Sequence, residues 1–362
     1  MNFQSDLFSE MAKICARGRW PSTSILLGSE GYGPLLLFRD LGKALLCKEA
    51  QEGFCDQCRD CKRMNQWSHP NVLLEFPMYG SKESDSYSKE WREWVIQEPF
   101  GNAVDWMQQL QQPTSRPNYS AKSCRNMIDK LGLANFEKNH RILFLWEADY
   151  LGKEGNILLK TIEEPPEDTF VVLTSRREEQ LLNTIRSRAQ TFRMTRISED
   201  SLAEYLEKEK ALPSDQARHL AFLADGSVRE ASFWADQSVS ESASYFVNFM
   251  RHAYKGDPYE LKKITEEAAR NGKNYIESSF EFGLKYIEAM LRFNYEGREG
   301  SIHLEDDIKL SAKKLSAIMD LTKLDKLKRL IEDLILGIQR NANKKLILYQ
   351  TALDVNYILR RK

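Results

Sequence analysis

The chain has 362 residues, of which 42% are hydrophobic and 29% are charged, and its net charge is −1 at pH 7. This composition is ordinary for a soluble globular protein of two or three domains, and it lacks the excess of positive charge that marks many nucleic-acid-binding proteins. No apolar run approaches the ~20 residues that cross a bilayer, and the N-terminus has no signal-peptide core. We expect a cytoplasmic protein with no membrane partner.

Residues 25–38 read ILLGSEGYGPLLLF, which is an apolar run, a glycine-rich turn and a second apolar run. We expect a short buried strand at Ile25–Leu27. A helix should begin at Pro34, because proline is tolerated in the first turn, where no backbone donor is needed. It should extend to about Leu46. A glycine turn between a strand and a helix N-terminus is typical of phosphate-binding loops.

The P-loop pattern G-x-x-x-x-G-K-[ST] fits this turn only in part. Gly28 and Gly33 stand at the two glycine positions, with Gly31 between them, but Pro34 replaces the lysine and Leu35 replaces the hydroxyl residue. In a working loop the lysine holds the outer phosphates and the hydroxyl binds magnesium. The sequence therefore predicts a turn that has lost its nucleotide-binding groups.

Four cysteines follow in CKEAQEGFCDQCRDCKRM (47–64), with the spacing C-x7-C-x2-C-x2-C. Clustered thiols in a reducing compartment favour a metal, and four sulfur ligands leave no open position. We predict a structural zinc ion bound by Cys47, Cys55, Cys58 and Cys61. Three alternatives stay open: an iron–sulfur cluster, although the further cysteine and proline of a ferredoxin-type run are missing, four unliganded thiols, or His69 in place of one sulfur.

Residues 80–118 are rich in serine and glutamine, yet contain Trp91, Trp94 and Trp106. We interpret them as an insertion with a short helix over about Lys89–Ile96. Exposed aromatic side chains can stack on nucleic-acid bases. Because Trp91 and Trp94 are i,i+3 neighbours on that helix, packing is the better interpretation of this pair.

Two further apolar segments, Arg141–Trp146 and Phe170–Thr174, read as buried strands, and Gly152–Glu164 between them reads as a helix ended by two prolines. Strands that alternate with helices predict a parallel sheet. After about Met194 the signals become helical. Two apolar stripes at helical spacing are interpreted as bundle core: Leu324, Leu327, Ile331, Leu334 and Ile338, and then Leu346, Tyr349, Leu353 and Tyr357.

Two stretches sharpen this interpretation: NILLKTIEEPPEDTFVVLTS (156–175) and LLNTIRSRAQTF (181–192). Together with the glycine loop and the cysteine module directly after its helix, they resemble the AAA+ clamp-loader subunits of bacterial DNA polymerase III. The resemblance covers most of residues 1–240, and NANKKLIL (341–348) adds weaker support.

The resemblance implies an α/β AAA+ core over 1–194, with helices on both faces of a parallel sheet. This core would contain the degenerate P-loop, the zinc module at 47–61 and the insertion at 80–118. A small helical lid over 195–238 and an all-α collar for oligomerisation over 239–362 would complete the chain.

Within this family the chain resembles the delta-prime, or stator, branch, which has no working ATPase, rather than the gamma/tau branch. In LFLWEADYL, Trp146 occupies the place of the magnesium-binding aspartate, while Glu147 remains. Together with Pro34 and Leu35, this implies that the phosphate and metal sites are both lost and that the chain binds no ATP. Asp149 lies beyond the expected strand and is not expected to replace the missing aspartate.

The stretch Ser187-Arg188-Ala189 resembles the S-R-C motif of the family, with alanine in place of the cysteine. The resemblance makes Arg188, next to Ser187, an arginine finger that acts in trans on the ATP site of a neighbouring subunit. Arg186 is a nearby alternative, and a surface ion pair is the simpler use of Arg188.

Two more residues match nucleotide-sensing positions of the family. Arg229, in DGSVREA, resembles the sensor-2 arginine, and Thr174 stands at the sensor-1 position. Since no nucleotide is expected here, the resemblance gives Arg229 another role, which is to tie the lid to the first domain.

The leading hypothesis is a non-hydrolysing subunit that completes an AAA+ ring with gamma/tau ATPases and delta. Through this complex it would help to load the sliding clamp on primed DNA during replication. The chain would not be an enzyme by itself, although it would be part of a DNA-directed DNA polymerase holoenzyme. Two alternatives stay open: an ATP-hydrolysing gamma/tau-type subunit with an aberrant P-loop, and a zinc-containing DNA-binding protein that uses basic residues such as Lys344-Lys345 and Arg360-Arg361-Lys362.

Overall fold

The computed structural model describes residues 3–112, 115–133, 140–236, 239–295 and 319–360. The contacts within the chain divide it into two compact units. The first unit contains residues 1–205 and 225–230, and the second contains 206–224 and 231–362. Residues of the predicted lid thus occur in both units, and the domain boundaries after 194 and 238 stay a prediction.

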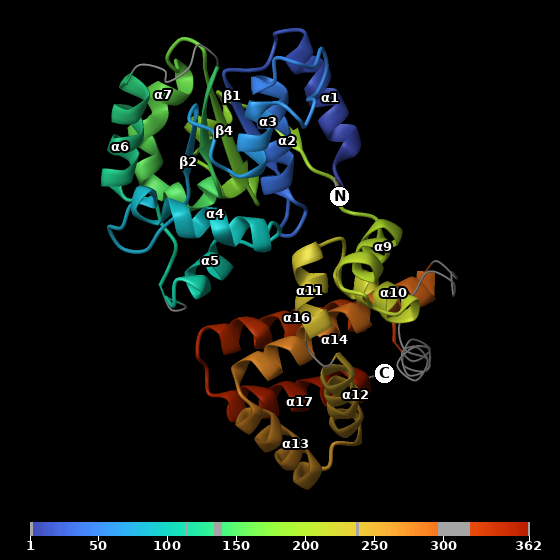
Figure 1. The fold of residues 1–362 in the computed structure, drawn as a ribbon. Coiled ribbons are helices and arrows are strands. Elements are labelled where there is room, and N and C mark those ends of the chain that lie inside the picture. The colour runs from blue at the N-terminus through green and yellow to red at the C-terminus, as the bar shows by residue number, and fades with distance from the viewer. Residues whose placement is uncertain (1–2, 113–114, 134–139, 237–238, 296–318, 361–362) are drawn as a thin grey trace. The chain divides into compact units, whose positions relative to one another are not determined.

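The first unit is built on a five-stranded parallel sheet with the strand order β2-β3-β4-β1-β5, as the alternation of apolar segments predicts (Figure 1). Because β1 lies between β4 and β5, the glycine turn that follows it lies beside the ends of these two strands. In the register of these strands, Leu26 pairs with Thr174 and Leu27 with Arg193. The strands are β1 Thr23–Leu27, β2 Val72–Glu75, β3 Arg141–Leu145, β4 Thr169–Ser175 and β5 Gln190–Arg193.

Helices cover both faces of this sheet, and Figure 1 shows α2 and α3 on one side with α6 and α7 on the other. Leu26 belongs to one core and its neighbours Ile25 and Leu27 to the other, because successive strand residues point to opposite faces. The helical elements are α1 Ser5–Ala16, α2 Pro34–Leu46, α3 Arg59–Asn65, η1 Ser84–Tyr87, α4 Ser88–Gln97, α5 Ala103–Gln109, α6 Ala121–Gly132, η2 Ala148–Leu158, α7 Leu159–Glu163, η3 Glu178–Gln180 and α8 Asn183–Arg186.

One predicted helix of this unit is divided in the structure. The sequence predicts a helix over Gly152–Glu164, and the structure has the 3-10 segment η2 followed by the short α-helix α7. Gly152 interrupts the segment with φ 51° and ψ −140°, which lies outside the helical region. The proline stop after α7 was read correctly, whereas the conformation of the glycine was missed.

Among the described residues, every regular element of the second unit is a helix. Two helices, α9 Glu199–Glu209 and α11 Val228–Asp236, contain residues of both units. The first predicted stripe is confirmed, because its five apolar residues on α16 are each at most 1% exposed. The other helices are α10 Ser214–Leu223, α12 Val239–Lys255, α13 Pro258–Asn271, α14 Lys273–Tyr295, α16 Leu321–Gln339 and α17 Lys344–Arg360.

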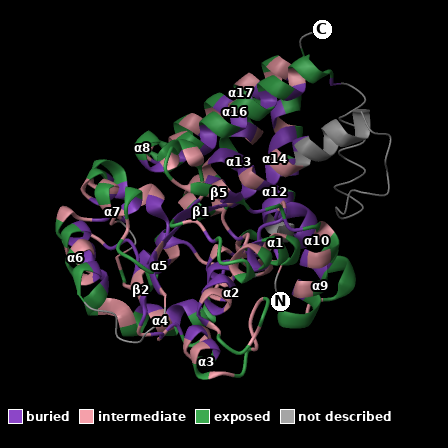
Figure 2. Ribbon diagram, turned by 90° about the horizontal axis from the view of Figure 1, so that it is seen from above, coloured by how far each residue is buried: buried purple, intermediate pink, exposed green. Residues whose placement is uncertain are grey.

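The second predicted stripe is wrong. On α17 the side chains of Leu346, Leu353 and Tyr357 are exposed by 70%, 44% and 59%. The face that packs into the bundle carries other residues, and Figure 2 shows exposed and buried positions alternating along this helix. Because α17 has apolar residues on two faces, helical spacing alone does not tell which face is buried. The buried face consists of Leu348, Thr351, Ala352, Val355 and Leu359.

Candidate functional site

The glycine turn keeps its glycines because of its backbone conformation. Gly31 and Gly33 have φ values of +77° and +85°, a region that side chains other than glycine rarely adopt. Neighbouring segments also approach closely. A β-carbon on Gly31 would lie 2.8 Å from the backbone nitrogen of Arg229, and one on Gly28 would lie 2.8 Å from the β-carbon of Met194.

The two residues that replace the lysine and the hydroxyl residue serve helix α2. Pro34 is the first residue of this helix, after Gly33 as its N-cap. Leu35 is fully buried and belongs to the core on that face of the sheet. The ring of Phe100, from the insertion, lies on the other side of the turn, 3.2 Å from a β-carbon placed on Gly33. At these two positions the chain therefore presents neither a cationic nor a hydroxyl side chain to a phosphate.

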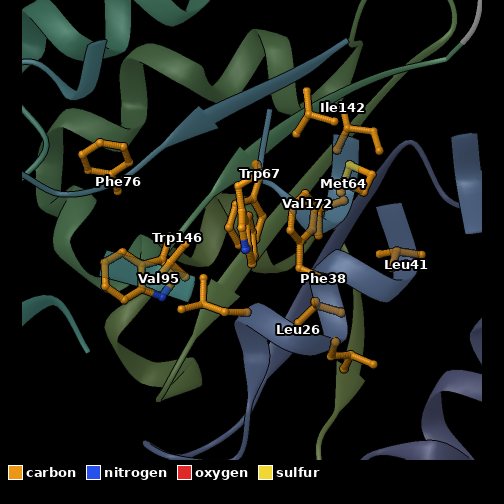
Figure 3. Packing of buried hydrophobic residues seen from close by; sticks show 14 of the residues in the cluster. Leu26, Phe38, Leu41, Met64, Trp67, Phe76, Val95, Ile142, Trp146 and Val172 are labelled. Atoms are coloured by element: carbon orange, nitrogen blue, oxygen red, sulfur yellow. The ribbon is translucent and has the colours of Figure 1, made fainter. Parts of the chain in front are cut away.

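Trp146 follows β3 and is completely buried. Its ring lies 5.8 Å from the ring of Trp91 and 5.6 Å from that of Trp94, both on α4 (Figure 3 shows Trp146 beside Val95 of the same helix). Trp106 of α5 lies 5.5 Å from Trp94. The packing interpretation of Trp91 and Trp94 is confirmed, and the insertion covers the position where the resemblance expects a magnesium-binding aspartate.

Glu147 is buried, and the protein satisfies its backbone N–H and one of its two carboxyl oxygens, while Oε2 makes no hydrogen bond and lies 3.9 Å from Nε of Arg176. Its backbone N–H donates to Thr174 Oγ1 at 2.7 Å, and its Oε1 accepts from the backbone N–H of Ala103 at 3.2 Å. The residue has φ 50°, an uncommon conformation for a residue with a side chain. Thr174 thus supports the backbone of Glu147 at the end of the strands.

The carboxyl group of Glu147 is electrostatically unusual. Burial raises its pKa to about 8, Arg176 opposes this rise, and the nearby charges of Glu30 and Asp149 add to it. At neutral pH this carboxyl group is therefore mostly protonated and is a poor ligand for a cation.

The other acidic residue of this segment, Asp149, is engaged within the chain. It accepts hydrogen bonds from Ser175 Oγ at 2.5 Å and from the backbone N–H of Arg176 at 3.0 Å. The Arg176 guanidinium also pairs with Glu30 and donates to the hydroxyl of Tyr150 at 3.1 Å. Asp149 is a structural anchor for Arg176.

Arg229 binds a carboxylate of the insertion. Its Nε and Nη2 atoms donate to the two oxygens of Asp105 at 2.6 Å and 2.7 Å, and Nη1 lies 3.5 Å from Glu30. Burial alone would lower the pKa of this guanidinium, but Asp105 and Glu30 raise it. Asn102 joins Glu30, Asp105 and Arg229 in one polar group, because its Nδ2 donates to Glu30 at 2.7 Å.

Sequence reasoning missed Glu30, Asn102, Asp105 and Arg176 as members of this group. The only available signal was Asn102-x-x-Asp105, which has the spacing of a capping box, and the structure forms this box at the start of α5. The pattern predicts a helix start but does not identify Arg229 as the partner.

The four predicted cysteines come together at the end of α2 and the start of α3. Their sulfur atoms all lie within 4.8 Å of one another, and the Cys47 and Cys58 sulfurs are 3.9 Å apart. Tetrahedral zinc with Zn–S bonds of ~2.3 Å requires sulfurs roughly 3.8 Å apart, so the cluster fits this ion. Backbone N–H groups of Gln57 and Cys58 lower the pKa of Cys55 to about 7, whereas burial raises the pKa of the Cys58 and Cys61 thiols, so the case for a metal rests on the geometry of the four sulfur atoms.

His69 is not part of this cluster. Its Nε2 lies 3.2 Å from an oxygen of Asp60, and its Nδ1 accepts from the backbone N–H of Asn71 at 3.2 Å. The alternative in which His69 replaces a sulfur ligand is therefore wrong for this conformation. The module is also held from α2, where the buried Lys43 lies 3.1 Å from Asp56 and 3.8 Å from the centre of the Phe54 ring.

The proposed finger follows α8 and lies on the surface of the first unit. The side chain of Arg188 is 37% exposed, pairs with Glu163 and donates to the backbone oxygen of Thr184 at 3.0 Å. Ser187 also bonds to Thr184, at 3.3 Å. Arg186, the alternative, lies 3.1 Å from Glu178. In this structure Arg188 forms a surface ion pair with Glu163, in agreement with the simpler interpretation. Its action in trans stays a prediction.

Comparison with known proteins places the chain in a family. The family model described as DNA polymerase III, delta subunit, matches residues 3–198, more than half of the chain. The chain belongs to this family. Together with relatives that carry the name delta′, this makes it a delta′-like clamp-loader protein.

The relatives are distant. The DNA polymerase III subunit delta′ of Bacillus subtilis strain 168 is 25% identical over 236 residues, which cover 64% of this chain and 60% of the relative. The delta′ subunit of Escherichia coli K12 is 25% identical over 222 residues, 61% of this chain and 56% of the relative. The chain thus matches less than two thirds of the length of each.

A solved structure, a DNA polymerase III gamma subunit-related protein from Thermotoga maritima, aligns with 98% of this chain and 100% of its own, at 15% identity and a TM-score of 0.38. In the part of the chain that the structure describes, we find no helix that is long and apolar enough to cross a membrane.

Proposed function

We propose that this chain is a non-hydrolysing subunit of a clamp loader. The observation that carries the proposal is the loss of the phosphate and magnesium ligands at the glycine turn and at the end of β3. Pro34 and Leu35 supply no phosphate or magnesium ligand, Trp146 is packed in an aromatic cluster, and Glu147 is buried with a pKa of about 8. Because hydrolysis requires a bound phosphate and its metal ion, these four positions support a role without ATP turnover in this chain.

The proposed organisation is an AAA+ core over 1–194, a lid over 195–238 and a collar over 239–362 that joins other subunits. The exposed apolar residues of α17, Leu346, Leu353 and Tyr357, support this use of the collar, because exposed apolar patches mark interaction sites. The partners would be gamma/tau-type ATPases and delta. Through them the chain would act in the cytoplasm on the sliding clamp and on primed DNA.

We further propose that the four cysteines hold a structural zinc ion. A bound zinc ion would link the end of α2 to the start of α3 through four thiolates, with no position left for a substrate. The ion pair of Lys43 with Asp56 would keep the turn between Cys55 and Cys58 close to α2.

The remaining chemical role belongs to Arg188. As an arginine finger it would leave Glu163 and place its guanidinium beside the transferred phosphoryl group in a neighbouring subunit. There it would offset the negative charge that develops in the transition state, an effect of about 10³–10⁵ in rate in other NTPases. The partial exposure of its side chain leaves it accessible for such a contact.

The test uses the complex reconstituted with its ATPase subunits, the sliding clamp and primed DNA. Arg188→Ala should lower clamp-stimulated ATP hydrolysis at the adjacent site by at least tenfold, and Arg188→Lys should not restore it, because lysine lacks the planar fork. Arg186→Ala is the matched control and should leave hydrolysis unchanged. An unchanged rate for Arg188→Ala, with the complex intact, would remove the finger from the proposal.

A further inference from the structure

The insertion over 80–118 reaches the glycine turn through α5 and the residues before it. Phe100 lies on Gly33, and the backbone N–H of Ala103 donates to Glu147. Asn102 and Asp105 bind the polar groups around the turn. One short segment therefore contacts each of the places where a nucleotide-binding turn would meet its ligand.

Asp105 is held in a fixed orientation for this contact. Its Oδ2 accepts a hydrogen bond from the backbone N–H of Asn102 at 2.9 Å, as part of the capping box of α5. The same carboxylate makes two parallel hydrogen bonds to Arg229, at 2.6 Å and 2.7 Å. A guanidinium binds a carboxylate and a phosphate with the same forked geometry, so Asp105 gives Arg229 what an anionic ligand would provide.

The two arginines around the turn are paired without a ligand. Arg176 pairs with Glu30 and Asp149, and Arg229 pairs with Asp105 and Glu30. A polyphosphate would have to displace these carboxylates or lie beside them. Like charges in a partly buried site repel strongly, so the site as built disfavours such a ligand.

The contact also fixes a separate part of the backbone. The N–H of Val228 donates to the carbonyl oxygen of Gly31 at 3.1 Å. Residues 225–230 belong to the first unit, although the chain on either side of them belongs to the second. The segment is held where Arg229 meets Asp105 and where Val228 meets the turn.

We propose that the insertion is a built-in substitute for a nucleotide, in which the Asp105 carboxylate takes the place of a phosphate on Arg229. The start of α11 is thereby fixed on the sheet-containing unit whether or not ATP is present. This inference rests on the proposed loss of nucleotide binding and gives the insertion its function.

The test measures amide hydrogen exchange at residues 227–230 in the full-length, zinc-loaded protein. Asp105→Asn keeps an oxygen for the capping box but removes the charge. It should speed exchange in this segment by about 10–100-fold, since charge-assisted hydrogen bonds contribute about 1.5–3 kcal/mol. Glu90→Gln, which removes an exposed carboxylate of α4 in the same insertion, is the control and should change nothing.

Inorganic tripolyphosphate then separates a phosphate substitute from an ordinary ion pair. It should restore slow exchange in Asp105→Asn, because Arg229 then lacks the carboxylate that binds its forked edge, and should have no effect on the wild type. Arg229→Gln should also exchange quickly but should not respond to tripolyphosphate. If Asp105→Asn does not fold, Asp105→Ser is used for the same exchange measurement with and without tripolyphosphate. Arg229→Gln tests the same ion pair by removing the guanidinium instead of the carboxylate.

Two results would overturn the inference: unchanged exchange in Asp105→Asn, or fast exchange that tripolyphosphate does not slow. Mg-ATP added to the wild type distinguishes this failure from failure of the proposed function. A change in wild-type exchange with Mg-ATP would contradict the loss of nucleotide binding itself. If Mg-ATP does not change exchange in the wild type and Asp105→Asn exchanges as slowly as the wild type, only the proposed role of the insertion is contradicted.

Discussion

The glycine turn and the cysteine turn lie at the two ends of helix α2, and they differ in what they have kept. At the start of the helix the backbone shape is retained in Gly31 and Gly33, while the phosphate and metal ligands are absent. At its end the chemical groups are retained, with four sulfur atoms within 4.8 Å of one another. Both motifs are small residues at fixed spacing. The glycine motif preserves a backbone shape without its ligands, whereas the cysteine motif preserves the ligands themselves.

This difference teaches that a motif should be read together with the groups that surround it. At the glycine turn, protein groups occupy the surroundings: Phe100 covers Gly33, and Asp105 binds Arg229. At the cysteine turn, Asp56 pairs with Lys43 and Asp60 with His69, and the four sulfur atoms lie within 4.8 Å of one another. The first site is filled by the chain itself, and the second brings together four sulfur atoms that could hold a metal ion.

The largest expected effect comes from breaking the cysteine turn. Cys58→Ser should abolish zinc binding, measured by elemental analysis of the purified protein, and should speed hydrogen exchange across residues 47–65. Structural zinc contributes about 10–16 kcal/mol of apparent binding free energy in small peptides, and part of this should stabilise the first unit.

Cys15→Ser is the matched control, because Cys15 lies on α1 outside the cluster. It should keep a full complement of zinc. Zinc-free wild-type protein with unaltered exchange at 47–65 would contradict a structural role for the metal, and iron in place of zinc would favour the iron–sulfur alternative.

A smaller effect should come from Glu147 at the glycine turn. Its pKa is raised by burial to about 8, so the folded state keeps a proton that the unfolded chain loses above its ordinary pKa of 4.5. Stability from this group is therefore full at low pH and is lost as the pH rises toward 8. With about 1.36 kcal/mol per pKa unit, the loss between pH 6 and pH 8 should be about 2 kcal/mol.

Glu147→Gln should remove this dependence, because glutamine does not titrate and still accepts from the Ala103 N–H. Urea unfolding of the wild type and of Glu147→Gln at pH 6 and pH 8 gives the change in the free energy of unfolding with pH for each protein. A wild-type protein that loses no more stability than Glu147→Gln over this range would show that the carboxyl group of Glu147 is ionised in the folded state, which would contradict the account of Glu147 as a protonated, poor ligand for a cation.

Much of the sheet-containing unit could be predicted because its signals are local. The strands β1, β3 and β4 are continuous apolar runs, α2 begins at a proline, and the cysteine spacing identifies its own cluster. The short strands β2 and β5 were not singled out, because four residues give little periodic signal.

The contents of the glycine turn could not be predicted for a different reason. Asp105 and Arg229 are separated by 124 positions, and their pairing depends on how the insertion packs through Trp91 on Trp146. Helix α17 illustrates the same limit, because its two apolar faces carry equal sequence signals and only the bundle decides which is buried. Local patterns predict elements, whereas these contacts arise from tertiary packing.

Equilibrium binding of Mg-ATP to the purified, zinc-loaded chain tests the central claim most directly. A turn without its lysine and hydroxyl residue, with Trp146 buried and both arginines paired to carboxylates, should show no binding at millimolar nucleotide. Binding in the micromolar range would mean that the backbone of the turn still holds a polyphosphate. The chain would then have to be regarded as a nucleotide-sensing or ATP-hydrolysing subunit.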